Sequence, residues 1–199
     1  MKLTIVRHGE TIDNISGIVQ GQTHSKLTKC GIKQAKLVGK RLRKEEFDLI
    51  ISSDLGRAVQ TTNEIVKYHP KTKVDFSQYL RELTSGIFDG KPTIERQRDR
   101  WRKKKNFYDY KPQGGESFHD LEARIKVFLK NLLFNHKEKN ILIITHGRWA
   151  KIMLNVLDKN NRKKYQFLKI LNTSVSQIEI DDLNRYNIVL LNCTKHLVE

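Results

Sequence analysis

Two histidines and two arginines stand behind three short apolar runs of the sequence, and their side chains suit phosphate chemistry. They are Arg7 and His8 after residues 2–6, Arg57 after residues 48–51, and His146 after residues 141–144. Each run is short and rich in β-branched residues, which is typical of a buried strand. Because ligand sites lie beyond the carboxyl ends of parallel strands, we expect the four side chains to meet at one edge of a sheet.

This set of side chains predicts a phosphate site with a nucleophilic histidine. The guanidinium groups of Arg7 and Arg57 offer forked donors that match the oxygens of a tetrahedral dianion. Both positive charges would lower the pKa of His8 between them, since a like charge disfavours imidazolium. A neutral imidazole nitrogen can then attack phosphorus. Gly9 and Gly147 would allow the backbone to approach the ligand closely.

Transfer of a phosphoryl group also needs an acid that protonates the leaving oxygen. Glu82 is the candidate, at the point where a short third strand gives way to a segment punctuated by glycines. Next to a bound phosphate its carboxyl group would keep its proton, because two negative groups disfavour ionisation. It could therefore donate a proton at neutral pH.

The elements that must position these residues alternate between strands and helices. Strands are expected at residues 2–6, 48–51, 74–76, 141–144, 174–180 and 187–193, with a turn at 181–184. Helices are expected from Thr28, from Ser53-Asp54, near 92–105, from Ser117 and from Gly147. This order predicts an α/β fold, a three-layer α/β/α sandwich with a mostly parallel central sheet. Helix N-termini at residues 54 and 147 would add N–H donors to the anion site.

Length and composition favour one cytoplasmic domain. A chain of 199 residues fills one α/β core, and no repeat or linker divides it, so we expect a single domain over residues 1–199. Its polar, glycine-punctuated middle predicts a surface excursion at about 83–113. No apolar run approaches the ~20 residues that cross a bilayer, and no signal-peptide pattern opens the chain. Cys30 and Cys193 have no metal-ligand spacing, so we expect reduced, structural cysteines and no metal.

The candidate residues belong to a series of blocks that resembles the histidine phosphatase superfamily, in its phosphoglycerate mutase-like branch. The blocks are residues 3–11 (LTIVRHGET) with Asn14, Gln20-Gly21, residues 27–35 (LTKCGIKQA), residues 52–61 (SSDLGRAVQT), Leu80-Arg81-Glu82, Gly86, Asp89-Gly90, residues 114–117 (GGES) and Thr145-His146-Gly147. They run in the family's order. A single Arg-His-Gly triplet would be a weak signal, whereas the ordered set is specific.

The resemblance implies a role for each matching residue. His8 would become a phosphohistidine that water hydrolyses, and Glu82 would act as acid and then as base for that water. The phosphoryl oxygens would contact Arg7, Arg57 and His146, and the pocket would be lined by Asn14, Gln20, Gly21 and the backbone of Gly147. The family needs no metal or other cofactor for this chemistry, and the sequence shows no metal-ligand motif.

The chain departs from the family pattern before residue 27. His24 and Lys26 stand where the family commonly has an Asp and a Pro. This difference bears on the geometry of the local loop and on contacts between subunits. A homodimer is possible, and the sequence does not decide the oligomeric state. Asp89 stands where the family more often has Glu, which is a mild change.

The length of the excursion favours a phosphatase over a mutase. Mutases of this branch carry a longer insertion between the acid and the GGES block, whereas residues 83–113 are all that separate Glu82 from Gly114. In this respect the chain is similar to the broad-specificity and α-ribazole phosphatases. We therefore expect metal-independent hydrolysis of small phosphorylated metabolites. A cofactor-dependent phosphoglycerate mutase is the alternative.

The net charge of +16 and the run from Arg96 to Lys105 (RQRDRWRKKK) allow further interpretations. The run is either a solvated, partly helical surface or a positive rim that attracts anionic substrates. Trp101 and Phe107 lie among the basic residues, so a basic nucleic-acid-binding protein is the alternative from another class. No helix-turn-helix, zinc or RNA-recognition motif supports it, and nucleic acid is the less favoured partner. The intact candidate site argues against a catalytically silent relative that only binds.

Overall fold

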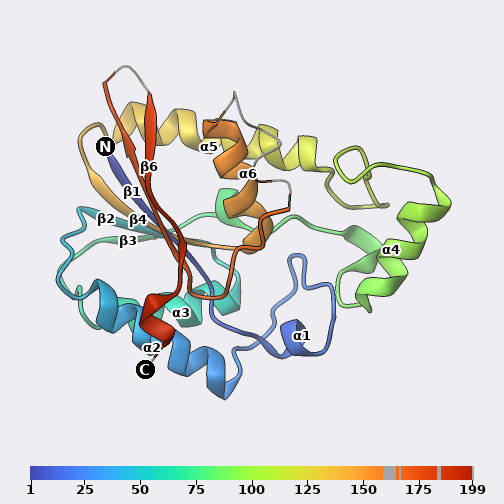
Figure 1. Ribbon diagram of the computed structural model, residues 1–199, viewed down its shortest axis with the longest axis horizontal. Helices are drawn as coiled ribbons and strands as arrows, with labels where there is room; N and C mark the ends of the chain where they lie inside the picture. The colour runs from blue at the N-terminus through green and yellow to red at the C-terminus, as the bar shows by residue number, and fades with distance from the viewer. Residues whose placement is uncertain (159–164, 166, 183–184, 199) are drawn as a thin grey trace.

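A six-stranded sheet forms the centre of the molecule in the computed structural model, which describes residues 1–158, 165, 167–182 and 185–198 (Figure 1). The strands are β1 (Lys2–Arg7), β2 (Leu49–Ser52), β3 (Val74–Phe76), β4 (Asn140–Thr145), β5 (Val175–Ile180) and β6 (Tyr186–Cys193). Their order is β3-β2-β4-β1-β5-β6. The pairings among β1 to β4 are parallel, and β5 pairs antiparallel with β1 and β6. The predicted strands and the mostly parallel sheet are confirmed.

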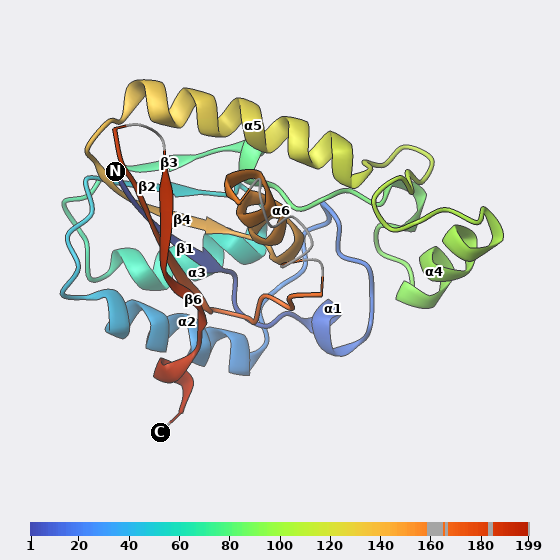
Figure 2. The same ribbon diagram turned by 45° about the horizontal axis from the view of Figure 1, so that its top comes forward.

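Helices cover both faces of this sheet, which confirms the three-layer sandwich. The longer helices are α2 (Lys29–Leu42), α3 (Gly56–Val66), α4 (Thr93–Arg102), α5 (Phe118–Asn135) and α6 (Gly147–Leu157). Figure 2 shows α5 on one side of the sheet and α2 on the other. The shorter elements are α1 (Ile12–Ile15) and the 3-10 turns η1 (Gln78–Leu80), η2 (Gly86–Phe88) and η4 (Lys195–Leu197). None of the helices in the described ranges is long and apolar enough to span a membrane.

Successive side chains of the central strands face opposite layers. Leu3 and Ile5 of β1 belong to the hydrophobic cluster built with α5 and α6, whereas Val6 belongs to the cluster built with α2 and α3. Ile143 and Ile144 of β4 divide in the same way. Because both faces are covered, most positions of the central strands are apolar, and the strands appear in the sequence as short apolar runs, with fully buried Thr4 as an exception in β1.

Two of the expected helix starts, at Thr28 and Ser117, are formed by capping residues. The Thr28 hydroxyl accepts a hydrogen bond from the Gly31 N–H at 2.9 Å at the start of α2. Ser117 and Asp120 form a capping box at the start of α5, in which each side chain accepts from the other residue's backbone N–H. Such caps satisfy N–H groups that have no partner within the helix.

The start predicted for α3, the helix that follows β2, is wrong by two residues. We expected it at Ser53-Asp54, whereas α3 begins at Gly56. The Ser53 hydroxyl accepts a hydrogen bond from the Leu55 N–H at 3.3 Å, which makes a turn before the helix. The N–H of Gly56 lies 3.4 Å from Nδ1 of His24. A helix N-terminus that offers N–H groups to an anion at residue 54 is therefore absent from this part of the described chain.

The predicted excursion lies at one end of the molecule and contains η2 and α4 (Figure 1). Trp101 of α4 is 59% exposed. The ring of Phe107 is partly buried, and its centroid lies 4.7 Å from that of Phe118, against which it packs. The single-domain organisation stays a prediction, and the turn predicted at 181–184 extends into residues 183–184, which lie outside the described ranges.

A close backbone crossing ties α2 to the loop that follows β1. A Cβ on Gly9 would lie 2.6 Å from the Gly31 carbonyl oxygen, and a Cβ on Gly31 would lie 2.0 Å from the Glu10 carbonyl oxygen. The same Glu10 carbonyl accepts from the Thr28 N–H at 3.0 Å. Only glycine fits at both crossing positions, and the contact holds the loop that carries His8.

Gly31→Ala is expected to destabilise the protein by about 1–3 kcal/mol, as overpacking does. Alanine at a helix position favours the helix by about 1 kcal/mol over glycine. Here the clash outweighs that gain, because the opposing atom is a backbone oxygen that cannot move aside alone. Urea unfolding measures the difference, with the exposed Lys36→Ala of the same helix as control, expected within about 0.5 kcal/mol. Unchanged or higher stability of Gly31→Ala would contradict the crossing.

Candidate active site

The carboxyl ends of three neighbouring strands bring the predicted residues together. Arg7 lies opposite Thr145 in the register of β1 and β4. The next backbone N–H along β1, of His8, donates to the Thr145 carbonyl at 3.0 Å. His146 follows Thr145, and Ser53 follows the end of β2 beside them, with its N–H bonded to a β4 carbonyl. The sheet register therefore sets which side chains can meet.

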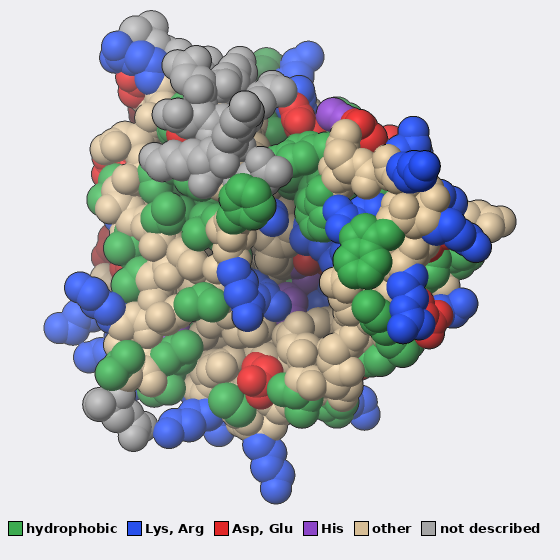
Figure 3. Space-filling model, turned by 45° about the vertical axis from the view of Figure 1, so that its right-hand side comes forward, with side chains coloured by type: hydrophobic (Ala, Val, Ile, Leu, Met, Phe, Trp, Pro, Cys, Tyr) green, Lys and Arg blue, Asp and Glu red, His purple; other side chains and the backbone are tan. Residues whose placement is uncertain are grey.

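A pocket of about 250 Å³ opens at this edge. Eight of the nine predicted site residues line it, namely Arg7, His8, Asn14, Gln20, Gly21, Arg57, Glu82 and Gly147. His146 lies behind the pocket wall and is fully buried. Figure 3 shows the hollow, with histidine atoms at its floor and Lys and Arg side chains around it.

The hydrogen bonds of His8 define its tautomer. Its Nδ1 lies 2.7 Å from the Gly9 carbonyl oxygen, which can only accept, so Nδ1 carries the proton. The other ring nitrogen, Nε2, then holds a lone pair. His8 is 2% exposed and lies at the wall of the pocket. The ring is thus held in the form that can act as a nucleophile.

Arg57 lies between the two histidines and joins them. Its Nε–H is shared between Nε2 of His8 at 3.3 Å and Nδ1 of His146 at 3.2 Å. Nε2 of His146 lies 2.8 Å from the Ser53 hydroxyl and donates to it. The second nitrogen of each ring is therefore an acceptor, and both rings are neutral.

The rest of the Arg57 guanidinium holds the loop that borders the pocket. Nη1 donates to the Thr23 carbonyl at 2.8 Å and Nη2 to the Gly21 carbonyl at 2.7 Å. Burial lowers the pKa of Arg57 to about 10, although Glu82 opposes the shift. The side chain remains charged at neutral pH, and its complete burial excludes a simple solvated role.

Arg7 supplies a second guanidinium whose hydrogen bonding is incomplete. Nη1 donates to the Ile170 carbonyl at 2.6 Å. Nε is buried and has no hydrogen-bond partner among the described residues. A Cβ on Gly147 would lie 3.4 Å from this Nε, so the missing side chain leaves room beside the donor. An unsatisfied buried donor costs roughly 1–3 kcal/mol, which an anion oxygen in the pocket would recover.

The electrostatics of the site keep both histidines uncharged. The pKa of His8 is well below 6.5, first because the ring is buried and then because Arg57 and Arg7 are close. The pKa of His146 is lowered by the same two effects, burial first and Arg57 second. The predicted direction is confirmed for His8, and burial is a larger cause than the like charges that the sequence indicated.

Glu82 lies at the pocket wall with both carboxyl oxygens on backbone donors. Oε1 accepts from the Leu83 N–H at 2.9 Å, and Oε2 accepts from the Arg148 N–H at 3.2 Å, in the first turn of α6. The predicted acid is thus in the same pocket as His8. Its position depends on an irregular segment rather than on a strand or helix.

The remaining predicted residues shape the pocket from two loops. Asn14 closes the capping box of α1, a four-residue helix too short for periodicity to predict. Gly21 has φ of +45°, and a Cβ there would lie 1.8 Å from Oδ1 of Asp89, so a larger residue is excluded. Oε1 of Gln20 is buried and has no partner among the described side chains and backbone.

Several pocket residues were not predicted from the sequence. They are Ile18, Val19, Thr93, Arg148, Lys151, Leu168, Lys169 and Ile170. Arg148 directly follows the Thr145-His146-Gly147 block, and Lys151 lies one turn further on α6, so helical spacing could have indicated both. Residues 168–170 have no regular structure and no motif that signals them.

No cluster of three or more His, Cys, Asp and Glu side chains that could hold a metal ion occurs within the described ranges.

Comparison with known proteins identifies the family. Residues 3–194 match the model of the histidine phosphatase superfamily (branch 1), and the chain belongs to this superfamily. The protein named probable phosphoglycerate mutase GpmB of Proteus mirabilis is 32% identical over 185 residues, which cover 90% of this chain and 85% of that protein. The predicted family is confirmed, which makes the chain a phosphatase-like or mutase-like enzyme.

Solved structures share the whole fold. Bacillus stearothermophilus YhfR is 27% identical with a TM-score of 0.89, over 98% of this chain and 98% of that one. The phosphoserine phosphatase of Entamoeba histolytica in complex with 3-phosphoglyceric acid is 26% identical with a TM-score of 0.84, over 99% of both chains. The predicted fold class is confirmed by these similarities.

The pKa values of the two buried histidines lead to a prediction about stability. Below about pH 6.5 the unfolded chain binds protons that folded His8 and His146 do not, so the free energy of unfolding falls as the pH falls. Each histidine contributes at most about 1.4 kcal/mol per pH unit. In His8→Asn this loss should be less steep between about pH 6.5 and pH 5, as measured by urea unfolding. Equal slopes for the variant and the parent would refute the buried neutral state.

Proposed function

We propose that this protein is a metal-independent phosphatase that hydrolyses small phosphomonoesters through a phosphohistidine on His8. The observation that carries the proposal is the hydrogen bond from Nδ1 of His8 to the Gly9 carbonyl. Nε2 then carries no proton. Its lone pair lies in a pocket with Arg7 and Arg57 and accepts one long hydrogen bond, shared with His146, from Nε of Arg57 at 3.3 Å. A nucleophile next to two forked cations fits attack on the phosphorus of a bound dianion.

The chemistry would proceed in two balanced steps. In the first, Nε2 of His8 bonds to phosphorus, the bond from phosphorus to the ester oxygen breaks, and the Glu82 carboxyl gives its proton to that oxygen. In the second, the Glu82 carboxylate takes a proton from water, the water oxygen bonds to phosphorus, and the phosphorus–nitrogen bond breaks. Phosphate leaves and His8 is restored. Arg7, Arg57 and His146 would stabilise the phosphoryl oxygens in both steps.

Hydrolysis is favoured over isomerisation by the shortness of the segment between Glu82 and Gly114, which comprises residues 83–113. A structural relative is named a phosphoserine phosphatase. The mutase stays the second candidate, because a sequence relative is named a probable phosphoglycerate mutase. The nucleic-acid alternative is weakened, because the Phe107 ring, one of the two aromatic side chains among the basic residues, packs against Phe118.

The pocket walls favour substrates with a second negative group. Arg148 and Lys151 of α6 line the pocket beside Glu82. The pKa of Lys151 is lowered by burial and then by the nearby charge of Arg148. Cations that are crowded in this way gain stability when an anion binds between them. A carboxylate or second phosphate on the substrate would supply that anion.

The proposed nucleophile is tested by phosphate release from p-nitrophenyl phosphate in the presence of EDTA. His8→Ala should lower kcat by about 1,000-fold or more, because the covalent route is lost. A histidine-bound phosphate should be trapped by rapid denaturation of the parent and be absent from the variant. The exposed His119→Ala serves as control, with activity expected to be unchanged. Parent-level activity of His8→Ala would exclude the mechanism.

The choice between hydrolysis and isomerisation needs a second assay, of 3-phosphoglycerate with and without a bisphosphoglycerate primer. Phosphate release should exceed mutase turnover. The reverse order would establish the mutase instead.

The second negative group is tested with Arg148→Met and Lys151→Met. Each should raise KM for phosphoserine by about tenfold or more, the value of one charge-assisted contact, and raise KM for p-nitrophenyl phosphate by less than about threefold. The exposed Lys36→Met controls for net charge. Equal changes for the two substrates would mean that the cations act on the transferred phosphate alone.

A further inference from the structure

We propose that Arg124 of α5, held by Glu116, is a positioning residue for Glu82: it fixes the backbone of residues 79–84 so that the acid meets the leaving group. This inference rests on the proposed function, in which Glu82 protonates the leaving oxygen. Neither Arg124 nor Glu116 lines the pocket that contains His8. Arg124 would therefore act through the loop and not on the substrate.

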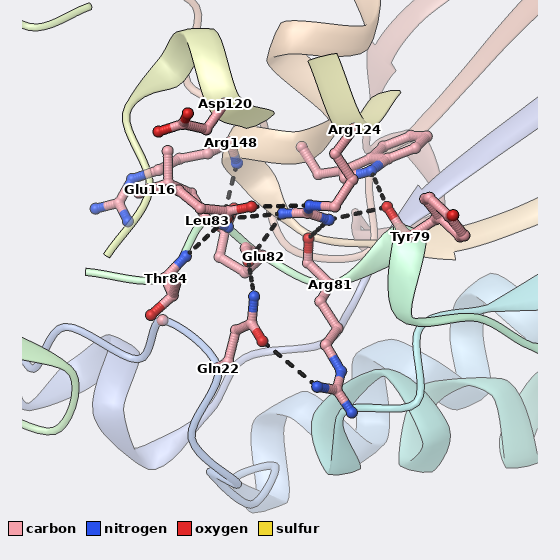
Figure 4. A network of polar contacts seen from close by, with 12 residues as sticks. Gln22, Tyr79, Arg81, Glu82, Leu83, Thr84, Glu116, Asp120, Arg124 and Arg148 are labelled. Atoms are coloured by element: carbon pink, nitrogen blue, oxygen red, sulfur yellow. Dashed lines mark hydrogen bonds and ion pairs between the residues drawn. The ribbon is translucent and has the colours of Figure 1, made fainter. Parts of the chain in front are cut away.

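The guanidinium of Arg124 makes five hydrogen bonds, as many as it has N–H donors (Figure 4). Nε and Nη2 bind the Glu116 carboxylate at 3.0 and 2.9 Å, side by side. Nη1 donates to the carbonyls of Tyr79 at 2.9 Å and Arg81 at 2.8 Å. Nη2 also donates to the Glu82 carbonyl at 3.4 Å. The side chain thus contacts the backbone at and before the proposed acid.

Three further hydrogen bonds fix the backbone of residues 79–84. The Glu116 carboxylate accepts from the Thr84 N–H at 3.2 Å, on the far side of Glu82. The Gln22 side chain donates to the Glu82 carbonyl at 3.1 Å, and the Trp149 indole donates to the Tyr79 carbonyl at 2.8 Å. Residues 81–85 belong to no strand or helix, so these side chains replace the ladder that would otherwise satisfy the backbone.

Glu116, which orients Arg124, belongs to a sequence motif that has no role in the proposed mechanism. Glu116 belongs to the segment GGES and directly precedes the cap of α5. A Cβ on Gly115 would lie 2.6 Å from the Pro112 ring and 3.0 Å from the Gly86 nitrogen, so the segment must pack closely against the excursion. Arg124 follows two turns into α5. The motif therefore places a carboxylate where it orients the guanidinium toward the loop.

The geometry favours position over charge as the function of Arg124. The ion pair with Glu116 balances its charge within the site, and both side chains are about four-fifths buried, with exposures of 17% and 20%. Lysine keeps the charge but lacks the planar fork that reaches three carbonyls and a carboxylate at once. A misplacement of about 1 Å in a reacting group can cost up to about 100-fold in rate.

The test compares two leaving groups in Arg124→Met, Arg124→Lys and Glu116→Gln. Values of kcat/KM report only the steps up to the first transfer, so the later attack of water does not contribute. For an alkyl phosphate such as phosphoserine, which needs the acid, kcat/KM should fall by about 10–100-fold in Arg124→Met and nearly as far in Arg124→Lys. For p-nitrophenyl phosphate, whose phenolate leaves without a proton, it should fall by less than about threefold. Inhibition by inorganic phosphate should stay unchanged.

Controls separate this inference from the proposed function. Glu82→Gln should show the same dependence on leaving group with a larger loss, and Lys126→Met, which removes an exposed ion pair of the same helix, should show none. Suppose that kcat/KM of Glu82→Gln depends on the leaving group, whereas kcat/KM of the Arg124 variants falls equally for both substrates. The positioning role of Arg124 is then wrong, and Glu82 is retained as the acid. If Glu82→Gln shows no dependence, the acid itself is wrong. If Arg124→Met does not fold, the same comparison of leaving groups in Glu116→Gln tests the positioning role, with a smaller expected fall in kcat/KM.

Discussion

The buried guanidinium of Arg57 is the interaction on which the rest of the site depends. It places one N–H between His8 and His146, so neither facing nitrogen can carry a proton. The other nitrogen of each ring is then fixed by the Gly9 carbonyl and by a serine hydroxyl. The arrangement needs three strand ends at set distances, and only a rigid parallel sheet with both faces packed supplies them.

The same site is left electrostatically incomplete. Arg7 has a buried donor without a partner among the described residues, and Arg148 and Lys151 add positive charge to the pocket where Glu82 is the carboxylate that lines it. A buried donor without a partner, such as Nε of Arg7, costs stability. Under the proposed function, a bound phosphate dianion would recover this cost, which is a general way in which active sites exchange stability for affinity.

The proposed nucleophile and the proposed acid are positioned by different means. His8 follows a central strand and is held by sheet register and the crossing of Gly9 with Gly31. Glu82 sits in irregular chain and is held by side chains from α5, α6 and the loop of Gln22. Under the proposed function, the sheet would hold the phosphate end of the site, whereas loop and helix side chains would hold the leaving-group end.

The strands, the helix starts at Thr28 and Ser117 and the residues proposed for the site could be predicted from the sequence, because these signals are local. An apolar run indicates a strand buried on both faces, and Thr28 and Ser117 mark helix starts through their own hydrogen bonds. Tertiary structure decided what depends on distant partners. The start of α3 is displaced by a turn at Ser53, the Arg7 side chain binds the Ile170 carbonyl, 163 positions away, and Arg124 reaches the acid loop 42 positions back. No periodicity encodes such contacts, since they exist only once the layers have packed.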